Sequence, residues 1–183
     1  MTQEEIKQTW EEVARKLYCP TPAEFEDMYR AKKETALESL ARRYRRFSIL
    51  GIVMVLCSFG WMQTAHFIPE MEMRWKVTVV MMLYFASCAI IDNWLYRGVS
   101  SIDCFTMSVS QVAEKALYYR KKHLQSMIVL LPFAVLVVGL MAYSLHANEY
   151  MLYGMAAGAV CGLLMGYIQF REFMKEYNLL IKE

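Results

Sequence analysis

Residues Arg42–Phe67 read RRYRRFSILGIVMVLCSFGWMQTAHF, a cluster of arginines followed by a long uncharged apolar run. A bilayer core about 30 Å thick is crossed by a helix of about 20 apolar residues. Core helices of soluble proteins rarely stay this long and this free of charge. The stretch from Phe47 to Phe67 therefore predicts a membrane-spanning helix.

Three further stretches have the same character: Trp75–Leu95, Met127–His146 and Tyr150–Phe170. The chain of 183 residues is 57% hydrophobic, above the roughly 45–50% of soluble domains. The charged residues are concentrated in the first 46 positions and between the apolar stretches. The sequence therefore predicts an all-α polytopic membrane protein with four transmembrane helices and helical cytosolic extensions.

The orientation follows from lysine and arginine, which are retained on the cytoplasmic side. Arginines precede the first span, Arg97 follows the second and Arg171 follows the fourth, whereas the opposite side carries only Arg74 and Lys76. Both termini are therefore predicted to be cytosolic. The predicted parts are amphipathic cytosolic helices (1–46), two spans (47–95), a cytosolic loop and helix (96–126), two spans (127–170) and a cytosolic tail (171–183).

Two cytosolic segments are expected to run into spans without a break. No glycine or proline lies between Ala23 and Ser48, so one continuous helix is predicted there. Ser108 and Gln111 have capping-box spacing, which predicts the start of a second such helix. Its apolar stripe consists of Val112, Ala116, Tyr119 and His123.

The N-terminal helices are predicted to be amphipathic, because their apolar residues recur at helical spacing, and the stripe of the second helix continues through Ala36, Leu40 and Tyr44 into the first span. We interpret one face as a surface that binds a soluble protein by packing of a helix into a groove. An alternative is that the cytosolic stripes pack on one another. The predicted partner-binding residues are Trp10, Val13, Leu17, Phe25 and Tyr29.

Glycines recur every four residues in the fourth predicted span, at Gly154, Gly158, Gly162 and Gly166. A face without side-chain bulk lets another helix backbone approach closely, which drives helix association in lipid. Packing within the chain is the favoured interpretation, and a homo-oligomer formed through this face is the alternative.

Polar groups in and near the spans are the first places to search for chemistry. Asp92 and Asn93 are interpreted as a structural bridge between helices rather than a proton path. The alternative function, a small transporter or channel component, would need a water-accessible polar path through Gln63, Asp92 and Asn93, and the sequence offers few such groups. His66 and His146 lie at the outer ends of two spans, where histidines are commonly hydrated, so no metal site is predicted.

Enzyme signatures are absent from the sequence, including HExxH, GxSxG, GxGxxG and the phosphate-binding GxxxxGK[ST] loop. No catalytic residue and no cofactor is therefore predicted. The net charge of +2 is too small for a nucleic-acid-binding protein. The five cysteines show no paired spacing, which indicates free thiols.

Two segments, Lys32–Ser48 (KKETALESLARRYRRFS) and Ser101–His123 (SIDCFTMSVSQVAEKALYYRKKH), resemble uncharacterised small bacterial inner-membrane proteins encoded beside extracytoplasmic-function sigma factors. The resemblance covers most of the chain in layout. It implies a role similar to that of a membrane-bound anti-sigma factor that holds a cytosolic partner. The chain departs from common anti-sigma domains because it has no HxxxCxxC zinc motif. It also lacks a sizeable outer domain.

The function predicted from the sequence is therefore that of a non-enzymatic regulatory or scaffold protein of the bacterial inner membrane. Its expected partners are the lipid bilayer and a cytosolic regulatory protein such as a sigma factor, with no direct contact to nucleic acid.

Overall fold

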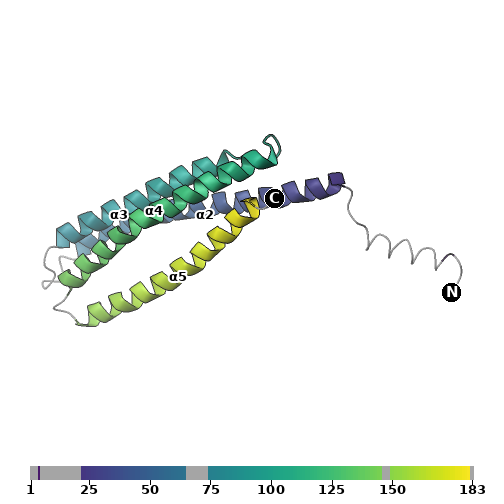
Figure 1. The fold of residues 1–183 in the computed structure, drawn as a ribbon. Coiled ribbons are helices and arrows are strands. Elements are labelled where there is room, and N and C mark those ends of the chain that lie inside the picture. The colour runs from purple at the N-terminus through teal and green to yellow at the C-terminus, as the bar shows by residue number, and fades with distance from the viewer. Residues whose placement is uncertain (1–3, 5–21, 65–73, 146–148, 182–183) are drawn as a thin grey trace. The chain divides into compact units, whose positions relative to one another are not determined.

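The computed structural model describes residues 4, 22–64, 74–145 and 149–181 of the chain. Its regular structure in these ranges is helical: α2 (Pro22–Thr64), α3 (Arg74–Ser100), α4 (Val109–Ser144) and α5 (Glu149–Ile181) (Figure 1). The predicted all-α class is confirmed. The chain divides into two compact units, Met1–Lys32 and Lys33–Glu183, and the packing described below lies within the second unit.

Local sequence signals set the helix starts. Helix α2 begins at Pro22 and continues unbroken to Thr64, because proline is favoured in the first turn and no later residue interrupts the helix. Ser108 caps α4: its Oγ accepts from the Gln111 N–H at 3.3 Å, and Gln111 Oε1 accepts from the Ser108 N–H at 3.0 Å. The predicted continuous helix and the predicted capping box are both confirmed.

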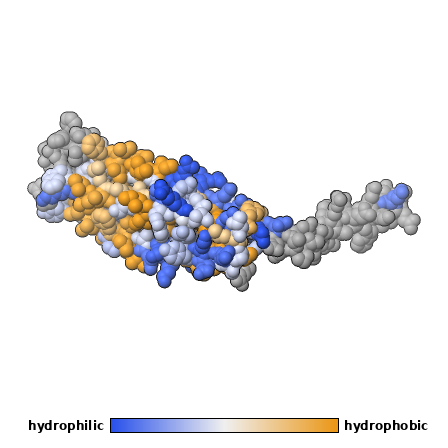
Figure 2. Space-filling model, turned by 90° about the horizontal axis from the view of Figure 1, so that it is seen from above, coloured by the Kyte–Doolittle hydropathy of each residue, from blue (hydrophilic) through white to orange (hydrophobic). Residues whose placement is uncertain are grey.

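Three of these helices, α3, α4 and α5, are long and apolar enough to cross a membrane. Many of their large apolar side chains point outward, including Ile90, Ile128 and Leu163. Figure 2 shows hydrophobic surface gathered over the helices beside a hydrophilic region. Water would disfavour so much exposed apolar surface, whereas hydrocarbon accommodates it. The chain therefore has the character of a membrane protein.

Close contact between α2 and α3 depends on small side chains. A Cβ at Gly51 would lie 2.9 Å from the Cβ of Ala89, nearer than two carbons can pack. One turn earlier on α2, Ser48 Oγ donates a hydrogen bond of 3.1 Å to the Ala89 carbonyl oxygen. Small residues with a hydroxyl donor are typical of helix contacts in lipid. Gly51 therefore sets the approach of these two helices.

Helices α3 and α4 form an antiparallel pair and lie side by side in Figure 1. Near one end, a Cβ at Gly98 would overlap the ring of Tyr119. Farther along, the rings of Tyr84 and Phe133 meet edge to face at 5.5 Å. The pair is thus aligned by aromatic rings of one helix placed against the other.

We predict that Gly51→Val destabilises the helical bundle by about 1–3 kcal/mol, because the added methyl groups must push Ala89 away. Gly60→Val is the matched control on the same helix, since a Cβ at Gly60 meets nothing within 4 Å. Unfolding in mixed micelles with increasing dodecyl sulfate measures both. Equal midpoints for the two variants would contradict the role given to Gly51.

Candidate functional site: the Tyr44 cluster

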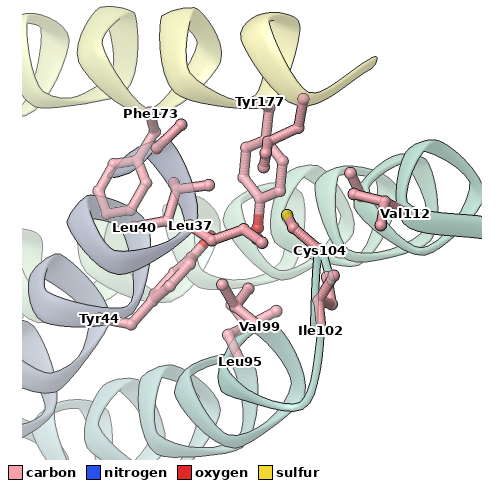
Figure 3. Close-up of a cluster of buried hydrophobic side chains, with 13 residues drawn as sticks. Leu37, Leu40, Tyr44, Leu95, Val99, Ile102, Cys104, Val112, Phe173 and Tyr177 are labelled. Atoms are coloured by element: carbon pink, nitrogen blue, oxygen red, sulfur yellow. The ribbon is translucent and has the colours of Figure 1, made fainter. Parts of the chain in front are cut away.

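The largest group of buried side chains lies at the polar ends of the helices, and we call it the Tyr44 cluster (Figure 3). All four helices and the α3–α4 loop contribute to it. In the most apolar stretch of α5, by contrast, none of the residues is buried by the described chain. The buried members are Ala36, Leu37, Leu40 and Tyr44 of α2, Leu95 and Val99 of α3, Ile102 and Cys104 of the loop, Val112 and Ala116 of α4, and Phe173, Tyr177 and Leu180 of α5.

Two fully buried tyrosines meet at the centre of the cluster. The hydroxyl groups of Tyr44 and Tyr177 share a hydrogen bond of 3.0 Å, which joins α2 to α5. Burial raises the pKa of Tyr44 above its ordinary value, and the Tyr177 hydroxyl raises it further. Burial also raises the pKa of Tyr177 to about 12. Both phenols therefore stay neutral near pH 7 and serve as a polar link inside an apolar cluster.

His123 of α4 packs against the same rings. Its ring centroid lies 5.0 Å from that of Phe173, 5.6 Å from that of Tyr44 and 6.5 Å from that of Tyr177. The side chain is 8% exposed, and neither ring nitrogen has a hydrogen-bond partner among the described residues. His123 precedes Met127, where the predicted span begins. Burial lowers the pKa of His123 to about 4, so the imidazole is neutral near pH 7.

Beside the tyrosines, Arg43 of α2 is held by polar groups of α5. Its Nη1 contacts a carboxylate oxygen of Glu172 and donates to Gln169 Oε1 at 3.2 Å. Its Nε donates to Glu176 Oε1 at 3.2 Å, and Ser39 Oγ donates to the same oxygen at 2.7 Å. This charged network adds a second connection between α2 and α5.

We predict that Arg43→Ala destabilises the protein by about 2 kcal/mol, because Glu172 and Glu176 would lose their cation in a partly buried site. Arg42→Ala is the matched control, since its pair with Glu38 spans 3.9 Å and both side chains are about two-thirds exposed (65% and 66%). Exposed pairs of this kind contribute about 0–1 kcal/mol.

The same dodecyl sulfate titration measures the two arginine variants in one host. If Arg42→Ala lost as much stability as Arg43→Ala, the contacts of Arg43 with α5 would have no special stabilising effect.

The α3–α4 loop contributes two buried side chains to the cluster. Asp103 accepts the backbone N–H of Phe105 at 2.8 Å and the hydroxyl of Thr106 at 2.9 Å. These hydrogen bonds, the first above all, lower the pKa of the Asp103 carboxyl. Ile102 and Cys104 on either side of Asp103 are buried, while Phe105 is 60% exposed. The loop thus inserts two apolar side chains and presents an aromatic ring outward.

The predicted partner-binding residues fall largely outside the described structure. Trp10, Val13 and Leu17 lie outside the described residues, as does the side chain of Phe25, whereas Tyr29 is half-buried on α2. Their role stays a prediction. Farther along α2, the stripe from Ala36 to Tyr44 packs within the chain, so the self-packing alternative holds for that part of the helix.

The glycine face of α5 contacts no other helix in the described structure. A Cβ placed at Gly154, Gly158, Gly162 or Gly166 would meet no described atom within 4 Å beyond the backbone of its own helix turn. The packing within the chain favoured by the sequence is therefore not observed there. The alternative, a seam to a second copy of the chain, stays a prediction.

Among the polar residues singled out near the spans, Asp92 and Asn93 are the two whose side chains the structure describes. Asp92 is half-buried on α3 and the adjacent Asn93 is exposed, so the two side chains do not share one face. His66, His146 and the Gln63 side chain lie outside the described residues. Within the described ranges, no group of three or more metal-binding side chains is present.

Sequence reasoning placed Tyr44 and His123 on apolar stripes but did not bring them together, and it assigned Phe173 and Tyr177 to a tail. Phe173, Tyr177 and Leu180 follow helical spacing, and α5 indeed continues to Ile181. That spacing is the signal that could have identified the α5 side of the cluster.

No protein-family model, no curated protein and no solved structure matches this chain.

Proposed function

We propose that this protein is a non-enzymatic regulatory or scaffold protein of the bacterial inner membrane, with four spans and both termini in the cytosol. In this proposal, its N-terminal helices bind a cytosolic regulatory protein. The observation that carries the proposal is the continuity of α2 from Pro22 to Thr64. One helix connects the end of the partner-binding stripe, the Tyr44 cluster and the apolar stretch that begins at Phe47.

Support for a fourth span comes from the outward face of α2. Ile52, Leu56 and Phe59 are exposed large apolar residues, while Gly51 on the same stretch packs against Ala89 of α3. Exposure to hydrocarbon on one side and helix packing on the other is the pattern of a spanning helix in a bundle. The remaining predicted residues of this span, up to Phe67, lie outside the described ranges.

Support for the orientation comes from the charges around the Tyr44 cluster. Arg42, Arg43, Arg120 and Arg171 all lie on helix segments next to the cluster or within one turn of it. Because arginine and lysine are retained inside, the proposal places the cluster in the cytosol directly beneath the bilayer.

We predict that reporters fused before Met1 and after Glu183 are both cytosolic, because the basic flanks are retained on that side. Alkaline phosphatase should be inactive at both positions, and a fluorescent protein should be bright at both. A reporter inserted between Glu70 and Met71 should show the reverse. An active phosphatase after Glu183 would overturn the proposed topology.

The proposed partner surface is an apolar helix face that precedes the packed part of α2. The stripe of α2 packs in the Tyr44 cluster from Ala36 onward, and the proposal assigns the stripe that precedes it in the sequence to a partner. An apolar helix face of this kind fits a groove on a soluble protein. Because the sequence resembles inner-membrane proteins encoded beside sigma factors, a sigma factor is the first partner to test.

We predict that Trp10→Ala combined with Leu17→Ala weakens capture of the partner about tenfold or more, because buried aromatic and aliphatic anchors dominate such interfaces. The matched control is Gln8→Ala combined with Glu12→Ala, which alters the polar side of the same predicted helix. Affinity purification from intact membranes, with membrane insertion checked by carbonate extraction, measures both variants. Equal capture by the two double variants would rule out the proposed surface.

A further inference from the structure

His123 lies where α2, α4 and α5 meet. Its ring is bordered by Tyr44 from α2 and by Phe173 and Tyr177 from α5 (Figure 3 shows these three neighbours). The side chain is almost fully buried, and both ring nitrogens lack a hydrogen-bond partner among the described residues. A buried polar group without a partner is unusual and requires an explanation.

Among the described residues, no carboxylate is hydrogen-bonded to the imidazole of His123. The titratable neighbours on α2 and α5 are the two tyrosines, which are neutral and hydrogen-bonded to each other. Glu172 and Glu176 on α5 pair with Arg43, and the second carboxylate oxygen of Glu176, Oε2, is buried without a hydrogen-bond partner among the described residues. On α3, the charge of Asp92 contributes to the raised pKa of Tyr44. The lowered pKa of His123 is caused by burial. On α4 itself, Arg120 is one turn away and is positive.

The buried residues of helix α5 lie in this region, while Met151 near its start packs, partly buried, against a second cluster around Val77 and Leu145. Its apolar stretch is not buried by the described chain, and its glycine face meets no other helix there. The buried residues of α5 are Phe173, Tyr177 and Leu180, all beyond the apolar stretch. Two of them border His123. A charge placed on His123 would therefore act on the main contact surface of α5.

We propose that His123 is a proton-operated latch, which holds the end of α5 against α2 and α4 while the imidazole is neutral and releases it when the imidazole is protonated. An imidazolium ion without an acceptor is costly inside an aromatic cluster. Opening of α5 gives the ring access to water, so proton binding and opening favour each other.

The direction and size of the pH effect on the opening of α5 follow from the pKa of His123 in the closed state and in the open state. In the closed state burial lowers the pKa of His123 to about 4, from 6.5 for an exposed histidine. The closed state binds fewer protons, so its stability is complete above pH 6.5 and declines as the pH falls from 6.5 toward 4. At pH 5.5 the ratio of open to closed α5 should rise about tenfold relative to pH 7.5.

Amide hydrogen exchange of the full chain in lipid nanodiscs tests the latch. In peptides covering Phe173–Ile181, the opening equilibrium should rise about tenfold between pH 7.5 and 5.5 after correction for the intrinsic exchange rate. His123→Phe keeps an aromatic ring of similar size that cannot be protonated, and its opening should not rise. His123→Leu is a second neutral variant, in case the larger ring of phenylalanine disturbs the packing.

If the opening equilibrium rose equally in the wild type and in both neutral variants, the latch would be overturned. Such a result would assign the pH dependence to carboxylates, which the variants retain. No rise in the wild type would overturn it as well. A carbon-13 NMR titration of the imidazole in the unaltered chain gives an independent answer. A midpoint below 6.5 supports the latch, and a midpoint at or above 6.5, as expected if the imidazolium paired with Glu176, overturns it.

Discussion

The arrangement of this protein depends on the burial of aromatic and aliphatic side chains where α5 meets α2 and α4, next to the apolar stretches. Within hydrocarbon, apolar surface gains little by leaving lipid for another helix, so helices there associate through shape and small residues. Beyond the hydrocarbon, water restores the hydrophobic effect. In the proposed topology the Tyr44 cluster lies on the watery side of that boundary, which accounts for the larger group of buried side chains found there.

The contrast between two sets of glycines follows from the same constraint. Gly51 is needed because Ala89 lies against it, and a neighbouring serine adds a hydrogen bond across the same contact. The glycines of α5 have the more regular spacing, yet they contact no other helix in the described ranges. Regularly spaced glycines show that one face of a helix lacks side chains. Whether another helix packs on that face depends on where the other helices lie.

The cluster also connects the proposed function with the proposed latch. Helix α2 extends from Pro22, near the end of the predicted partner-binding stripe, through the cluster into its apolar stretch. The Tyr44–Tyr177 hydrogen bond and the Arg43 network join that helix to α5. A change in the charge of His123 would act on the surface that these contacts hold together, and so on the position of α5 relative to α2.

The sequence by itself determined the helical class, the long apolar helices and the start of α4 at its Ser108 cap, because hydropathy and capping are local properties of the chain. It also placed Tyr44 and His123 on apolar stripes. Only the tertiary structure decided that these two side chains meet Phe173 and Tyr177. It also decided that, among the described residues, Gly51 rather than Gly158 faces another helix and the nitrogens of His123 have no hydrogen-bond partner. Contacts between residues far apart in the chain depend on how the helices align, and periodicity within one helix carries no information about its neighbour.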